Sequence, residues 1–298
     1  METELYKIRS TRACFRAAYD LFCTNLSTII KKTWLPMLVL SAVGCLCYVI
    51  PWMSNSHGAD DAEKAKLLVA NMAMGLGWAI ATLVASVWAV TGVVCLLNGQ
   101  TKKVNAPRVA RATVIETAAA ILTAATATAL SLIPFLRAGA TQAGVSETTL
   151  TLSGAIMVGT TVVWGIALLP MAYSITKYLM EPSAKVGIIV GSAYRQGWHR
   201  WGFLFGCALL CLVICSLFMV IVKAPENILL MAQLADNTGR LMGDASELPA
   251  HYAFMTYVLG TLCTFIWCYL MTWVGMVFYY AYGSMEAKKK ETTLTTTH

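Results

Sequence analysis

The chain has 298 residues, of which 58% are hydrophobic and only 12% are charged, and its mean hydropathy is +0.64. A soluble domain usually carries about 25% charged residues, so this composition excludes an ordinary soluble protein and indicates a membrane protein. The net charge of +7 could suggest a nucleic-acid partner, but the basic residues sort by loop, as described below.

The first 33 residues are polar and charged, and no long apolar run begins before residue 34. A secretory signal peptide would place its apolar region much earlier, so we expect none here. We expect residues 1–33 to form a cytoplasmic amphipathic segment. The first apolar run would then be retained and serve as the insertion signal.

Six apolar runs follow along the chain. A bilayer core about 30 Å thick requires about 20 apolar residues in a helix, and the runs of this kind are 34–52, 67–97, 113–136, 150–177, 202–222 and 252–282. The second, fourth and sixth are longer than needed and should tilt or extend past the lipid. The sequence therefore predicts an all-α, polytopic membrane protein with a six-helix transmembrane domain over residues 34–282.

The distribution of Lys and Arg predicts the orientation of the chain. Seventeen of the 22 Lys and Arg residues lie in the N-terminal segment, in the loops 98–112 and 177–201, and in the tail 283–298. Basic residues mark the cytoplasmic side of a membrane protein, so both termini are predicted to be cytoplasmic, in a multi-pass protein of the plasma (inner) membrane. The positive charge then indicates contact with the bilayer, including anionic lipids at its cytoplasmic face, and not with nucleic acid.

This layout corresponds to three helical hairpins, each preceded by a basic cytoplasmic stretch. Two of these stretches, FRAAYDLFCTNLSTIIKKTW and VGIIVGSAYRQGWHRW, alternate apolar and polar residues at about helical spacing and end in Trp and basic residues. Such segments are typical of amphipathic helices in the headgroup layer. AAYDLF and SAYRQGW share an [AS]AY start, which leaves open a duplication or ordinary linkers with interface anchors.

The stretch FRAAYDLFCTNLSTIIKKTWLPMLVL resembles the start of the six-span bacterial membrane domains attached to some glycerophosphodiester phosphodiesterases, and of related stand-alone proteins of unknown function. In those proteins an amphipathic lead-in with an Asn just before a span recurs along the chain. Asn25 matches that Asn, and no Asn lies near Trp198 in the second stretch. The resemblance covers about half of the chain, carries no catalytic motif, and implies a fold but no activity.

Two patterns indicate helix packing inside the membrane. Small residues recur every four positions in the second span, at Gly77, Ala81, Ala85 and Ala89, and such a stripe lets helices approach closely. In the fifth span, CALLCLVIC places cysteines at Cys207, Cys211 and Cys215. These three extend over about 12 Å of one helix and cannot all reach one metal ion, so we interpret them as small apolar packing residues and expect no metal or cofactor.

One ionisable residue lies clearly within a predicted span. Glu116 is near the cytoplasmic start of the third span, and Arg108 and Arg111 are close enough in sequence to pair with it. Ionisable residues inside membranes are costly and often functional. Two interpretations stay open: an interfacial Glu that reaches the headgroups, or a proton- or cation-binding carboxylate that faces the bundle.

The sequence contains no HExxH, GxSxG, P-loop or GxGxxG motif in a suitable setting, so we predict that the protein is not an enzyme. The first hypothesis is a scaffold or subunit that acts through protein or lipid partners, including a second copy of the chain. The alternative is a small transporter, which would explain the three hairpins and the Thr-rich middle spans. The 29-residue outer loop 223–251 is predicted to form a short helix, which could be a lid, a partner-docking surface or a simple connector.

Overall fold

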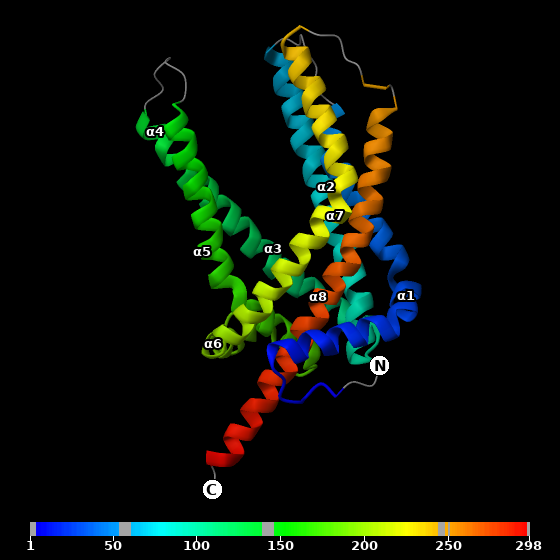
Figure 1. Ribbon diagram of the computed structural model, residues 1–298, viewed down its shortest axis with the longest axis vertical. Helices are drawn as coiled ribbons and strands as arrows, with labels where there is room; N and C mark the ends of the chain where they lie inside the picture. Colours follow the sequence, from blue (N-terminus) through cyan, green and yellow to red (C-terminus); the bar gives the residue numbers. More distant parts are fainter. Residues whose placement is uncertain (1–3, 54–60, 139–145, 244–247, 250, 297–298) are drawn as a thin grey trace. The chain divides into compact units, whose positions relative to one another are not determined.

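The computed structural model describes residues 4–53, 61–138, 146–243, 248–249 and 251–296, and parts of the predicted outer loops (54–60, 139–145 and 244–247) lie outside them. The described chain is helical, with no strand in these ranges (Figure 1). Its α-helices are α1 Thr11–Met53, α2 Asp61–Asn98, α3 Lys102–Ser131, α4 Ile133–Ala138, α5 Glu147–Met180, α6 Ser192–His199, α7 Trp201–Leu241 and α8 Tyr252–Thr296. One 3-10 turn, η1, covers Val186–Ile188.

Six helices are long and apolar enough to cross a membrane, which confirms the predicted number of spans. Each predicted span falls within one of them, with α3 and α4 together forming the third. Large apolar side chains point outward from these helices; Val220 and Ile221, for example, are 71% and 72% exposed. Exposed apolar surface on this scale is unusual for a soluble protein and is the surface that lipid covers.

Two helices are longer than the sequence patterns indicated. The segment 223–241, which we predicted to belong to an outer loop with a short helix of its own, instead continues α7 through Pro225 as one helix of 41 residues. The segment 283–296, predicted as a polar tail, continues α8, which has 45 residues. Apolar periodicity marks only the part of a helix that faces lipid or a core, so it misses polar turns that extend the same helix.

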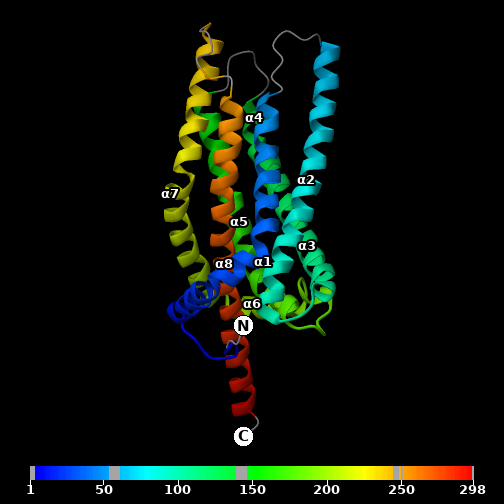
Figure 2. The same cartoon turned by 90° about the vertical axis from the view of Figure 1, so that its right-hand side faces the viewer.

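Local chemistry explains the interruptions. α3 ends at Ser131 and α4 begins at Ile133, and Pro134 lies at the second position of α4. Proline has no N–H to bond the preceding turn but is well tolerated in the first turn of a new helix. α1 changes direction along its length in Figures 1 and 2. Pro36 lies within it, and proline is a usual cause of such bends.

The chain divides by its contacts into two compact units. The first unit comprises Met1–Leu5, Arg9–Ala106 and Leu209–Tyr280, and the second comprises Tyr6–Ile8, Pro107–Ala208 and Ala281–His298. In the first unit α1 and α2 lie side by side (Figure 2). Two polar pairs join α1 to α8 there. The hydroxyl oxygens of Thr33 and Tyr269 lie 3.4 Å apart, and Ser41 Oγ lies 3.7 Å from Cys268 Sγ.

The small-residue stripe of α2 is buried only in part. Ala85 and Ala89 are buried, Ala81 is half-buried and Gly77 is exposed. Nothing lies within 4 Å of a Cβ built at Gly77, whereas a Cβ at Gly92, three residues beyond Ala89, would meet Thr33 Cγ2 at 3.2 Å. The close approach of α1 and α2 therefore includes Gly92, which the four-residue spacing did not mark.

In the second unit, α5 is the central element. It contacts α3 through the Trp164 indole N–H, which donates to Thr126 Oγ1 at 2.8 Å, and through the Ser153 hydroxyl, which donates to the Ser131 carbonyl at 2.7 Å. The second predicted amphipathic stretch becomes η1 and α6, and α6 packs on α5. α5 begins at a Ser146 N-cap, whose hydroxyl accepts from the Thr149 N–H.

Candidate functional site

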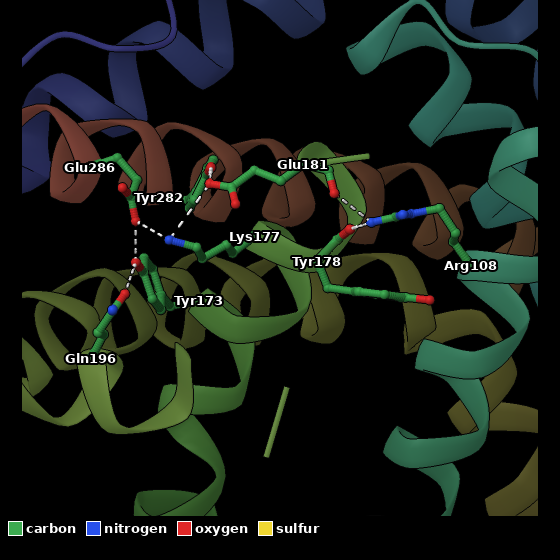
Figure 3. A network of polar contacts seen from close by, with 8 residues as sticks. All are labelled: Arg108, Tyr173, Lys177, Tyr178, Glu181, Gln196, Tyr282 and Glu286. Carbon is green, nitrogen blue, oxygen red and sulfur yellow. Dashed lines mark hydrogen bonds and ion pairs between the residues drawn. The ribbon is translucent and has the colours of Figure 1, made fainter. Parts of the chain in front are cut away.

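The second unit contains a group of polar side chains that we call the Lys177 network; its members are Tyr173, Lys177, Glu181, Gln196, Tyr282 and Glu286 (Figure 3). The Glu286 carboxylate lies 2.8 Å from the Lys177 nitrogen and accepts a hydrogen bond from the Tyr173 hydroxyl. A second carboxylate, Glu181, lies 3.6 Å from the Lys177 nitrogen and accepts a 2.9 Å hydrogen bond from the Tyr282 hydroxyl. Gln196 Oε1 lies 3.1 Å from the Tyr173 hydroxyl.

Helical spacing brings these side chains together. Tyr173 and Lys177 are four residues apart on α5, Glu181 follows four residues later as the C-cap of that helix, and Tyr282 and Glu286 are four residues apart on α8. Residues at this spacing share one face of a helix. The network forms where the polar face of α5 meets that of α8, and Gln196 joins it from α6.

The network is largely withdrawn from solvent. Tyr282, Tyr173 and Glu286 are 0%, 3% and 8% exposed. A buried charge is tolerated only where it is paired and hydrogen-bonded. Here one ammonium lies between two carboxylates, and each carboxylate accepts a hydrogen bond from a tyrosine. Every ionised group in the network therefore interacts with another group of the chain, an arrangement suited to holding helices together.

Arg108 caps the end of α5 beside this network. Its guanidinium donates to the carbonyls of Glu181 and Pro182, each at 2.7 Å, and to the carbonyl of Tyr178, and it lies 4.4 Å from the centre of the Tyr178 ring. The last carbonyls of a helix lack partners within it and form the negative end of its dipole. Arg108 supplies both the missing donors and a positive charge.

We expect Arg108→Ala to lower the free energy of unfolding by about 2 kcal/mol, the usual scale for losing hydrogen bonds to a charged group. The measurement is the unfolding of the detergent-solubilised protein followed by circular dichroism. Arg111→Ala is the matched control, because Arg111 is exposed and makes no hydrogen bond or ion pair with a described residue. If the two variants were equally stable, water would be shown to replace the hydrogen bonds that Arg108 donates to the end of α5.

Glu116 does not pair with Arg108 or Arg111, contrary to the prediction from sequence. Arg108 is directed to the end of α5 instead, and Glu116 is exposed on α3 without a hydrogen bond or ion pair among the described residues. This environment fits an interfacial Glu better than a carboxylate facing a bundle. Adjacency in sequence did not show that the Arg108 guanidinium reaches the end of α5, where it donates to three carbonyls.

The first unit has an ion pair inside a long apolar helix. Lys223 Nζ and Glu226 Oε2, both on α7, lie 2.6 Å apart, and the two side chains are 18% and 15% exposed. Lys223 also donates to Thr264 Oγ1 on α8 at 3.0 Å, and that oxygen lies 3.5 Å from Cys45 Sγ on α1. The sequence analysis placed both charged residues in an outer loop, where they would need no partner.

Gly260 on α8 lies beside this pair. A Cβ built at Gly260 would lie 3.7 Å from the Glu226 carboxyl carbon and 3.4 Å from Cys45 Sγ. Three helices thus meet around one carboxylate and one ammonium. Ionisable side chains in such helices are costly and often mark a functional position.

The three cysteines of α7 differ in burial. Cys207 and Cys211 are buried, and Cys215 is half-buried. The nine cysteines whose side chains the structure describes form no disulfide. Within the described ranges, no three His, Cys, Asp or Glu side chains gather closely enough to hold a metal ion. The packing interpretation of the cysteine stripe stays a prediction.

Sequence reasoning missed the Lys177 network because its two halves are far apart in the chain. Lys177 and Glu286 are separated by 109 residues, and Glu286 lies in what looked like a polar tail. A usable signal did exist: the four-residue spacing of Tyr173, Lys177 and Glu181 and of Tyr282 and Glu286 gives two polar faces of complementary charge.

Comparison of the chain with family models, with curated proteins and with solved structures gives no match.

Proposed function

We propose that this chain is a non-enzymatic integral membrane protein that acts as a scaffold or subunit with protein or lipid partners. The observation that carries the proposal is the Lys177 network, in which the Lys177 ammonium pairs with the buried Glu286 and with the half-buried Glu181. A catalytic centre usually keeps a nucleophile or base directed at substrate. Here the carboxylates, the ammonium and the tyrosine hydroxyls all serve helix-to-helix contacts, which favours a structural role.

The topology belongs to the same proposal. We place both termini in the cytoplasm of a cell with an inner membrane, with the six spans arranged as three hairpins. The bend in α1 (Figure 1) and the short α6 support amphipathic helices at the membrane surface. The proposed likeness to the membrane domains of some glycerophosphodiester phosphodiesterases would agree with this layout.

Native mass spectrometry of the full-length protein, extracted gently with its own lipids, tests the proposal. A protein or phospholipid partner retained in a fixed ratio is the expected result, and a second copy of the chain counts as a protein partner. A monomer that retains neither, and instead carries one defined small solute, would contradict the scaffold function.

The Lys223–Glu226 pair favours a second candidate, a small transporter. Transporter sites often combine charged groups with an irregularity in a helix. Pro225 lies between the two charged residues inside α7, and proline removes one hydrogen bond of the helix. A solute that carries charge could replace one partner of the pair, because Lys223 and Glu226 present one charge of each sign.

If the second candidate is correct, Glu226→Gln should lose a solute that co-purifies with the wild type, because the amide keeps the shape of the side chain but removes its charge. Native mass spectrometry compares the bound solute in the two proteins, and thermal unfolding checks that both are folded. Glu147→Gln is the control, since Glu147 is exposed at the start of α5. Equal solute content in all three would exclude Glu226 from solute binding.

A further inference from the structure

The orientation of α6 is fixed by contacts of its inner face. A Cβ built at Gly197 would lie 2.8 Å from Pro170 Cβ and 3.0 Å from the Pro170 carbonyl oxygen, so α6 lies directly against α5. The Tyr194 hydroxyl donates to the Ala167 carbonyl at 2.7 Å, and Gln196 joins the Lys177 network. Ala193 is also buried. A helix held at these points presents one defined outer face.

That outer face combines an unpaired cation with aromatic and apolar surface. Arg195 is exposed, and its guanidinium makes no hydrogen bond or ion pair with a described residue. Trp198 is 41% exposed, its indole N–H has no partner in the described chain, and its ring packs edge-on against Tyr194. Val190, just before α6, is 68% exposed.

The segment that carries this face has charges of one sign. Residues 182–201 contain Lys185, Arg195 and Arg200 and no Asp or Glu. Lys185 and Arg195 are exposed. A guanidinium presents a planar set of donors that matches the oxygens of a phosphate group, and tryptophan prefers the boundary between headgroups and acyl chains.

We propose that the outer face of α6, formed by Val190, Arg195 and Trp198 with Lys185 nearby, binds the headgroup of an anionic phospholipid. The inference rests on the proposed function in assuming that the chain lies in a bilayer and has lipid partners. Arg195 binds the lipid phosphate, while Trp198 and Val190 contact the first carbons of the acyl chains. This apolar part of the face is the reason to choose a lipid over free phosphate.

The test uses the full-length protein in nanodiscs of phosphatidylcholine and phosphatidylglycerol in equal parts. Native mass spectrometry after release measures the phosphatidylglycerol retained by the wild type and by Arg195→Gln. We expect about fivefold weaker retention in the variant, the effect of one basic residue near an anionic surface. Arg111→Gln removes an equally exposed charge from the same unit and should match the wild type. A Trp198→Ala variant should also lose retention, although it keeps every charge.

Three results would overturn the inference. Arg195→Gln could retain as much phosphatidylglycerol as the wild type. Both arginine variants could lose it equally, which would show unspecific attraction by net charge. Inorganic phosphate could displace the lipid, which would show a phosphate site without lipid contacts. In each case a protein partner found with the natively extracted chain would still support the scaffold function. Failure of the lipid site can therefore be told apart from failure of the proposed function.

Discussion

Glu286→Ala is expected to lower the free energy of unfolding by about 3 kcal/mol, the lower part of the range for breaking a buried ion pair. The variant leaves the Lys177 ammonium, whose side chain is 14% exposed, with Glu181 at 3.6 Å as its remaining carboxylate. The Tyr173 hydroxyl also loses its acceptor. Because Glu181 stays, we expect a cost below that of a fully unpaired buried charge. Denaturant unfolding in detergent measures the change.

The double variant Lys177→Met with Glu286→Leu separates pairing from burial. Replacing both partners of a buried pair by apolar side chains of similar size is often neutral or stabilising, so this variant should be more stable than Glu286→Ala. Lys288→Ala is the control on the same helix, where Lys288 is exposed, and should stay within about 0.5 kcal/mol of the wild type. If Glu286→Ala unfolds like Lys288→Ala, the network does not stabilise the second unit.

Gly197→Ala is expected to release α6 from α5. The new methyl carbon would lie 2.8 Å from Pro170 Cβ, 3.0 Å from the Pro170 carbonyl oxygen and 3.1 Å from its Cα. Two of these three atoms belong to the backbone and cannot move aside alone, so the helices must separate. Overpacking of this kind costs about 1–3 kcal/mol, partly offset by the better helix propensity of alanine. Hydrogen–deuterium exchange should rise in the peptide that covers 192–199.

Gly202→Ala is a matched control only five residues away. Nothing lies within 4 Å of a Cβ at Gly202, and it lies in the first turn of α7, so alanine there should leave stability unchanged or raise it. Faster exchange of α6 in Gly202→Ala, or unchanged exchange in Gly197→Ala, would contradict the close packing of α6 on α5.

The number and position of the long apolar helices could be predicted from the sequence, because membrane-spanning length leaves a direct trace in composition. Their ends could not. Pro225 and the charged residues beside it resemble a loop, yet the helix continues there, where Lys223 and Glu226 neutralise each other and Lys223 also donates to Thr264. Local sequence does not show such partners, which come from a helix 41 residues away.

The candidate site was harder to predict than the fold. Glu116 attracted attention because it stands in an apolar run, whereas Glu286 follows the run of α8 and looked like part of a solvated tail. The structure reverses their environments: Glu116 is exposed and Glu286 is 8% exposed. Burial depends on which helices meet, and one sequence contains no measure of that. A functional role of Arg108 stays a prediction, and its partners are the carbonyls of Tyr178, Glu181 and Pro182 instead of Glu116.

The long separation between Lys177 and Glu286 sets an order of events during biosynthesis. The ribosome adds about 5–20 residues per second. Glu286 lies 109 residues after Lys177, so roughly 5–20 s pass between the synthesis of the two residues. During that interval Glu181, four residues away, is the nearest carboxylate in sequence to Lys177. The second unit therefore cannot be completed helix by helix as the chain emerges. Lys177 on α5 lacks its Glu286 partner until the last turns of α8 have been synthesised.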